Sequence, residues 1–164
     1  MDVKKVTDDA IKNGGVLAML YFDLHAVDKE SAQQLGTGFV NHLIKTEGVI
    51  YALGEIDEPI SGGEGKNFST SISVKMLCKD FITLSSLCLT HSPFNVEILR
   101  PDEVYLPLNV AHEVLSLMAA TTAEYKKYIL TKIAGPEEMR EFQEQLKVRA
   151  ELGKKILEKK EGEK

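Results

Sequence analysis

The sequence lacks several features that mark large classes of proteins. It contains no tryptophan and only two cysteines, Cys78 and Cys88, among 164 residues. Two cysteines cannot supply the four thiolates of an iron–sulfur cluster, and we expect no cofactor. The N-terminal stretch also lacks the apolar core of a secretory leader. Together with the small number of cysteines, this indicates a reducing, cytoplasmic compartment.

Two kinds of partner are excluded on similar grounds. No apolar run approaches the roughly 18 residues that a membrane-spanning helix requires, so we expect no membrane contact. The formal net charge is -5, whereas a nucleic-acid partner usually requires a basic patch. The composition, 43% hydrophobic and 27% charged, is that of a soluble globular protein that can bury a core.

Specific catalytic motifs are missing as well. The glycine-rich residues 61–66 suggest a phosphate-binding loop, but the glycine spacing is wrong and no serine or threonine follows Lys66. That segment also joins two strands, so no helix N-terminus would receive a phosphate. Serine is abundant, yet no nucleophile elbow is present. The sequence therefore leaves open whether the protein is an enzyme.

The order of the predicted elements is β-α-β-β-α-β. Alternating apolar residues predict strands at residues 16–26, 49–56, 68–78 and 94–99, with Phe94, Val96 and Ile98 of the fourth strand facing the core. Helical spacing predicts helices at residues 28–47 and from Asp80 to Ser92. A short helix without a function precedes the first strand and ends before two glycines.

This element order over residues 16–99 resembles the ferredoxin-like fold. The resemblance implies an α+β class: a four-stranded antiparallel sheet in the strand order 4-1-3-2, with both helices on one face. It implies no function, because this fold supports many unrelated activities.

The helix at residues 28–47 carries a clear apolar stripe. Asp28 is its expected N-cap and Gly48 its expected stop. Gly36 and Gly38 lie inside it, where glycine costs about 1 kcal/mol relative to alanine, and both indicate a closely packed neighbour. The residues of the stripe are Ala32, Leu35, Phe39, Val40, Leu43 and Ile44.

Two additional helices follow the fourth strand. We expect one domain over residues 1–135, which includes a long helix at residues 109–133 with Asn109 as its N-cap, and then a charged helix and tail at residues 136–164. The apolar stripe of the long helix requires a partner. That partner is either the uncovered face of the sheet or a second copy of the chain, so we expect a homo-oligomer. The last helix has a thin apolar seam of Met139, Phe142, Leu146, Ala150 and Leu157.

One group of polar residues is a candidate site. In the assumed strand order, strand alternation places them on the face away from the two helices, near one end of the sheet. His25 with Asp23 or Glu55 could serve as an acid–base pair or hold a divalent metal, although a solvated face is the simpler interpretation and we expect no metal. The expected ligand-binding residues are Tyr21, Ser71, Ser73, Lys75 and Asn95.

The other three histidines have structural interpretations. His42 lies at the edge of the first helix's apolar stripe, and His112 lies in the first turn of the long helix. His91 is expected near a helix C-terminus, whose dipole favours the protonated imidazole.

Three functions remain open. The first is an oligomeric module that binds a small polar molecule or has a regulatory role, without catalysis. The second is an enzyme acting on a small polar or anionic metabolite at the polar face, with His25 as its acid or base. The third is a scaffold that docks through its C-terminal helices. The missing catalytic motifs favour the first.

Overall fold

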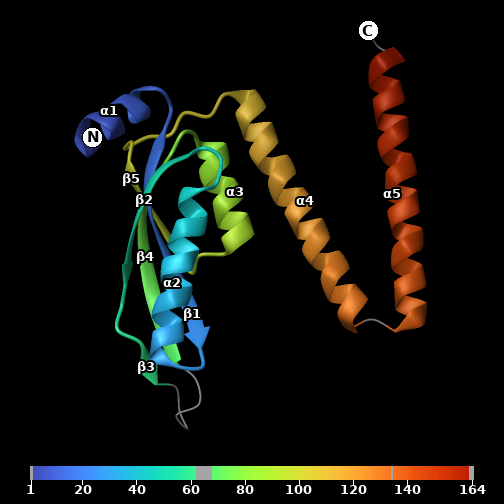
Figure 1. Cartoon of the computed structure of the whole chain (residues 1–164). Coiled ribbons are helices and arrows are strands. Elements are labelled where there is room, and N and C mark those ends of the chain that lie inside the picture. Colours follow the sequence, from blue (N-terminus) through green and yellow to red (C-terminus); the bar gives the residue numbers. More distant parts are fainter. Residues whose placement is uncertain (1, 62–67, 134, 163–164) are drawn as a thin grey trace. The chain divides into compact units, whose positions relative to one another are not determined.

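The computed structural model describes residues 2–61, 68–133 and 135–162, and over these residues the protein is an α+β structure (Figure 1). Two compact units are present, Met1–Leu117 and Met118–Lys164, with the boundary inside α4. The domain boundary expected at residue 135 stays a prediction. The elements are α1 (Val3–Lys12), β1 (Val16–Ala26), α2 (Lys29–Ile44), β2 (Val49–Ile56), β3 (Ile60–Ser61), β4 (Phe68–Cys78), α3 (Phe81–His91), β5 (Asn95–Arg100), α4 (Leu108–Ile133) and α5 (Pro136–Gly162).

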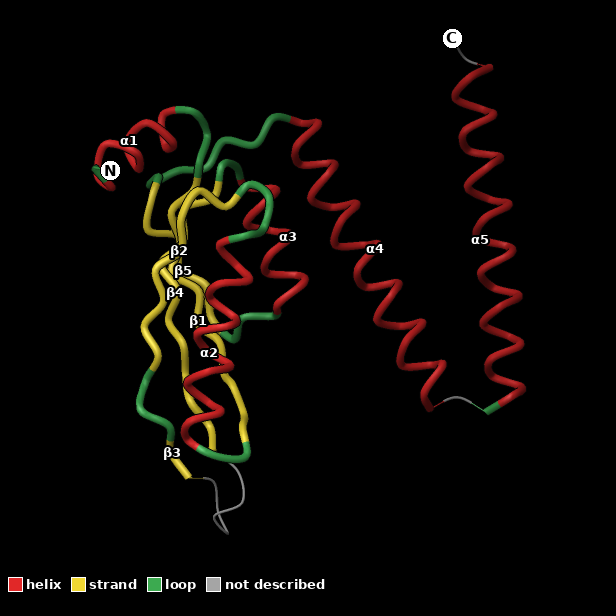
Figure 2. Tube along the Cα trace, viewed as in Figure 1, coloured by secondary structure: helices red, strands yellow, loops and turns green. Residues whose placement is uncertain are grey.

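The four long strands form an antiparallel sheet in the order β2-β4-β1-β5. Taken from the β5 edge, this is the order 4-1-3-2 that the sequence predicts. The two-residue strand β3, which pairs with β4, was not expected. Figure 2 shows α2 and α3 on one side of the sheet and α1 on the other.

The core lies between the sheet and the helices α2 and α3. Cross-strand pairs such as Leu20 with Val74 and Phe22 with Ile72 place their side chains on this face. Leu20, Val74 and Ile72 are fully buried, and α2 contributes Leu43, which is buried as well. Each such side chain stabilises the fold by about 1.5–3 kcal/mol. Alternation along β1 and β4 therefore encodes the buried face of the sheet.

Helix α2 packs through a glycine rather than through its whole apolar stripe. The Asp28 carboxylate accepts the backbone N–H of Ser31 at 2.7 Å, as an N-cap should. Gly36 is buried, and a Cβ atom there would lie 2.8 Å from Cδ1 of Ile56. The expectation of a close neighbour is thus confirmed at Gly36. It is wrong at Gly38, where a Cβ atom would meet nothing within 4 Å.

Two other expectations for α2 are wrong. Leu35 and Ile44 lie outside the buried stripe, with exposed fractions of 52% and 44%, because Gly36 occupies the line of contact with the sheet. The helix also ends at Ile44, before Gly48. Gly48 instead adopts a positive φ of 88° in the turn that leads into β2, where a side chain would strike Thr83.

Strand β5 forms one edge of the sheet and runs from Asn95 to Arg100, one residue later than expected. Val96 and Ile98 pair with Leu20 and Ala18, so they do lie on the helix side. The prediction that they and Phe94 face the core is wrong, because their exposed fractions are 38%, 44% and 61%. The register shift beside Leu17 marks a bulge.

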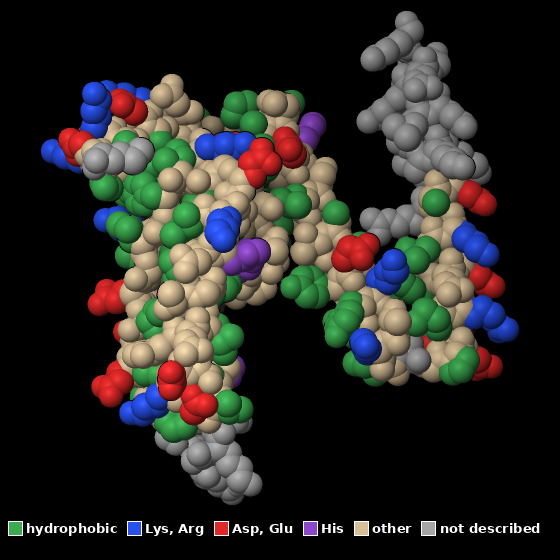
Figure 3. Space-filling view, in the orientation of Figure 1, with side chains coloured by type: hydrophobic (Ala, Val, Ile, Leu, Met, Phe, Trp, Pro, Cys, Tyr) green, Lys and Arg blue, Asp and Glu red, His purple; other side chains and the backbone are tan. Residues whose placement is uncertain are grey.

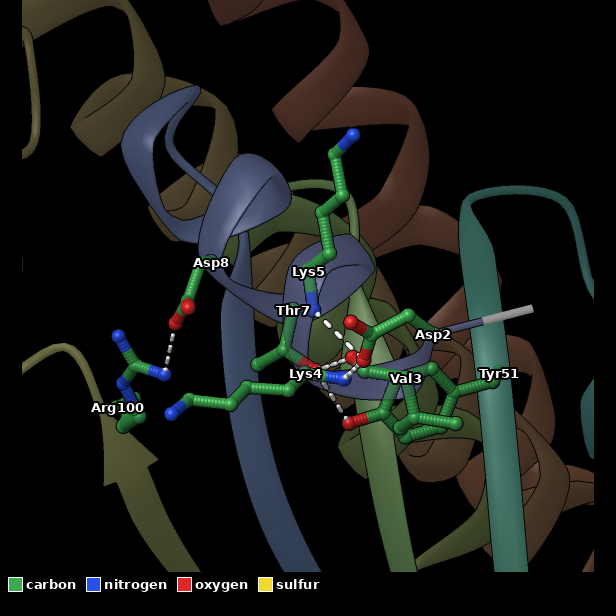
Figure 4. A network of polar contacts seen from close by, with 8 residues as sticks. All are labelled: Asp2, Val3, Lys4, Lys5, Thr7, Asp8, Tyr51 and Arg100. Carbon is green, nitrogen blue, oxygen red and sulfur yellow. Dashed lines mark hydrogen bonds and ion pairs between the residues drawn. The ribbon is translucent and has the colours of Figure 1, made fainter.

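Helix α1 covers one end of the opposite face of the sheet, a role that the sequence analysis did not assign to it (Figure 4). The buried Thr7 hydroxyl lies 3.0 Å from the Tyr51 hydroxyl and donates to the Val3 carbonyl. Arg100 donates to Asp8 at 2.7 Å, which lowers the pKa of that carboxyl. Polar contacts therefore fasten α1 to both outer strands of the sheet.

The long helices α4 and α5 bury little. Helix α4 begins at Leu108, so Asn109 lies in its first turn and is not the N-cap. None of its described residues is buried, and even the apolar side chains of Leu115 and Met118 are exposed. On α5, Leu146 is also exposed, and Leu157 of the expected seam lies outside the described side chains. Over the described residues, no helix has the length and apolar character to cross a membrane.

Candidate functional site

The face of the sheet opposite α2 and α3, here called the open face, carries the predicted site residues. The register of the strands arranges them in rows across the sheet. One row contains Glu55, Ser73, Tyr21 and Asn95, and the next toward α1 contains Leu53, Lys75, Met19 and Glu97. The structure thus places every predicted site residue on one face, and α1 closes one end of it.

His25 lies at the end of the open face away from α1. Its Nδ1 atom is 2.8 Å from the Ser69 hydroxyl, and its Nε2 atom is 3.1 Å from Oδ2 of Asp23. Both side chains of the His25–Asp23 pair are exposed, at 67% and 63%. This serine–histidine–aspartate chain is open to water, whereas such chains act in catalysis where water is excluded and an oxyanion is bound.

Glu55 does not join His25. Glu55 pairs with Ser73 and His25 pairs with Ser69, so they are two strands and four residues apart. Strand geometry makes this separation roughly 15 Å. Asp57, which follows β2, lies nearer to His25 than Glu55 does. Its carboxylate accepts a hydrogen bond from the Ser71 hydroxyl. Ser71 lies opposite Asp23 on β1.

Asp57 directly follows β2 and is held against β4. Its backbone N–H donates to the Ser71 carbonyl at 3.0 Å, and its carbonyl accepts from Thr70 at 2.6 Å. These contacts extend the pairing of β2 and β4 by one residue beyond Ile56. The only sequence signal was strand alternation, which continues from Glu55 to Asp57.

Tyr21 is the half-buried centre of the open face. Burial raises the pKa of its hydroxyl, and the Glu97 carboxylate raises it further. The Phe94 ring lies beside it, with ring centroids 6.1 Å apart. An aromatic floor flanked by Ser73 and Asn95 could bind a small polar molecule by stacking and hydrogen bonds.

No metal-ligand cluster is present on the open face as far as the structure describes it. Within those residues, no group of three or more histidine, cysteine or acidic side chains could hold an ion. Glycine-rich residues 62–66 lie outside the described part of the chain, so the exclusion of a phosphate loop there rests on sequence spacing alone.

His91 departs from its expected behaviour. It lies in the last turn of α3, as expected. Its pKa is nevertheless lowered, first by burial and then by the neighbouring imidazole of His42. The expectation that the helix dipole favours the protonated form is therefore wrong, because desolvation outweighs it.

A polar groove of about 300 Å³ beside the N-terminus of α3 was also missed. It is assembled from the α2–β2 connection, the residues around the α3 N-cap, and the first turns of α4. Such separated segments give no joint signal in the sequence. Its charged lining residues are Glu47, Lys79, Asp80 and Glu113.

The similarities of the chain define its class. Residues 17–161 match the family model described as the MJ0538 family. The match covers most of the chain, and the protein belongs to the MJ0538 family. Neither a curated protein nor a solved structure shows significant similarity to it.

Proposed function

We propose that the protein is a cytoplasmic module that self-associates through α4 and binds a small polar ligand on the open face, without catalysis. The observation that carries the proposal is that α4, 26 residues long, has no buried residue in its described length. We also assign the sheet to the ferredoxin-like class, on its strand order. The free thiols of Cys78 and Cys88 support a reducing compartment.

The composition of α4 supports a buried role. Residues 114–123 contain no charged side chain, and a helical segment without charged residues is typical of an interior or an interface. Figure 3 shows hydrophobic side chains gathered at the surface of the C-terminal half of α4.

The spacing of the exposed residues supports a second copy as the partner. Most of the exposed apolar residues of α4 fall at the a and d positions of one heptad register, which lets identical helices interlock side chains. Tyr128 and Ile133 fall outside these positions. A twofold interface then buries the same surface on both chains. The exposed apolar residues in this register are Leu108, Leu115, Met118, Tyr125 and Ile129.

The test is the mass of the full chain in solution, measured by light scattering across a concentration series. We expect a dimer, and a monomer for the double variant Leu115→Asp, Tyr125→Asp, with unchanged circular dichroism. Ser116→Asp adds one negative charge to the same helix outside the a and d positions and should remain dimeric. A monomeric parent at high concentration, or a dimeric double variant, would contradict the proposal.

The ligand role rests on the row of Tyr21, Ser73 and Asn95. A thermal-shift screen of small polar and anionic metabolites should yield a compound that raises the melting temperature, because a ligand of the folded state stabilises it. Asn95→Ala should reduce that shift, whereas Asn109→Ala on α4 should not. Equal shifts in both variants would remove the open face from the proposal.

A second candidate, an enzyme for a small polar or anionic metabolite, is favoured by the chain Ser69–His25–Asp23. His25 would act as the acid or base, and Asp23 would orient its ring. In an activity screen, turnover should be lost in His25→Ala and retained in His112→Ala. Turnover that survives both substitutions would exclude this site.

A further inference from the structure

We propose that His42 and His91 form a binding site for a transition-metal ion, with Zn²⁺ as its occupant. His42 lies in the last turn of α2 and His91 in the last turn of α3. Their ring centroids are 5.7 Å apart and the rings are inclined at 77°. Two elements that are distant in sequence thus bring two imidazoles together.

The separation of the rings fits a shared ion. A zinc–nitrogen bond is about 2.0–2.1 Å and the ring centre lies about 1.1 Å from each nitrogen, so two imidazoles on one ion hold their centres roughly 5–6 Å apart. The observed 5.7 Å falls in this range.

The ring nitrogens of this pair are available for ligation. Within the described residues, the ring nitrogens of His42 and His91 take part in no hydrogen bond or ion pair. His25 differs, because Ser69 and Asp23 engage both of its nitrogens at 2.8 and 3.1 Å.

The surroundings restrict one of the two ligands. The Phe39 ring, one turn before His42 on α2, packs against His91 with centroids 5.6 Å apart at 81°. An apolar neighbour of this kind restricts the ring orientation of a ligand.

The choice of ion follows from the ligands. Imidazole nitrogens suit Zn²⁺, Cu²⁺ and Ni²⁺, whereas Mg²⁺ and Ca²⁺ require oxygen ligands. Two protein ligands leave coordination positions for water, and His42 is exposed enough to admit it. Bound Zn²⁺ would link the ends of α2 and α3 and so stabilise their packing on the sheet.

The experiment uses the full chain after treatment with a chelator. ZnCl₂ is titrated by calorimetry at neutral pH, and the melting temperature is recorded with and without Zn²⁺. We expect one Zn²⁺ per chain and a higher melting temperature. MgCl₂ should produce neither effect.

The variants His42→Phe and His91→Phe keep a ring against Phe39 and remove the ligating nitrogen. Each should lose the Zn²⁺-dependent rise in melting temperature and bind Zn²⁺ roughly tenfold or more weakly. His112→Phe should behave like the parent.

Absence of Zn²⁺ binding by the parent would overturn the proposal, as would binding that survives both His42→Phe and His91→Phe. If His91→Phe fails to fold, the exposed His42→Phe decides the question by itself. Light scattering of the same samples separates this result from self-association through α4, which does not involve either histidine.

Discussion

Helices α2 and α4 carry comparable apolar stripes but differ in what those stripes contact. Helix α2 buries Ala32, Gly36 and Leu43 against the sheet, while α4 buries none of its described residues. The difference lies in how closely the backbone approaches its neighbour. Gly36 lets α2 lie directly on Ile56, and α4 has no glycine along its length. A stripe shows that a helix needs a partner, whereas a buried glycine indicates where that partner is.

The largest expected effect compares one leucine from each helix. Leu43→Ala removes a fully buried side chain from the core and should lower the free energy of unfolding by about 2–5 kcal/mol. Leu115 has 62% of its surface exposed. Leu115→Ala should therefore lower the free energy of unfolding by less than about 0.5 kcal/mol at concentrations where the chain is monomeric. Urea denaturation at low protein concentration measures both values. Equal losses would mean that the two stripes are covered alike.

A second substitution tests the close approach of α2. Gly36→Leu places a side chain where even a Cβ atom would lie 2.8 Å from Ile56 and 3.1 Å from Ile72. Overpacking of this kind should lower the free energy of unfolding by about 1–3 kcal/mol. The control is Ser116→Leu at an exposed position of α4. It should leave the free energy of unfolding, measured in urea, within about 0.5 kcal/mol of the parent. No loss at Gly36 would show that α2 does not rest on β2.

A third substitution extends the comparison to α1, which contacts the sheet through polar side chains. Tyr51→Phe removes the hydroxyl that lies 3.0 Å from the buried Thr7 hydroxyl. Thr7 still donates to the Val3 carbonyl, so the cost should be about 0.5–1.5 kcal/mol. Amide hydrogen exchange in α1 should rise more than exchange in α2. Uniform exchange would contradict a local role for this contact.

The smallest expected effect has the opposite sign. Gly38→Ala adds a methyl group that meets nothing within 4 Å and reduces the conformational freedom of the unfolded chain. It should raise the free energy of unfolding by about 0.4–1 kcal/mol, measured in urea against the parent. A loss of stability would mean that Gly38, like Gly36, faces a close neighbour.

The sequence predicted the strands well because their signal is local. The bounds of β1, β2 and β4 match the predicted ranges, since each is a run of alternating residues that ends at a turn. Alternation also predicted the shared face of Tyr21, Ser73 and Asn95. Both results depend on the two-residue period of a strand, which neighbouring elements do not alter.

Positions along the strands could not be predicted in the same way. Alternation assigns Glu55 to the correct face but does not say how far it lies from His25, which depends on the register between strands. The contact of α1 with the open face could not be predicted for a related reason. Thr7, Asp8 and Arg100 hold α1 there, and these residues carry no periodic signal.

The position of β1 in the sheet has a consequence for how the chain folds. Within this sheet β1 is synthesised before the other strands, yet its neighbours are β4 and β5. Val16 therefore cannot pair until Cys78 has been made, nor Leu20 until Val96 has been made. The hairpin of β2 and β4 can form earlier, because its pairing is more local. During synthesis the most apolar strand of the protein is therefore unpaired the longest, and long-range pairing of this kind slows folding. A chaperone that holds extended apolar segments should therefore bind residues 16–24 before it binds the later strands of the sheet.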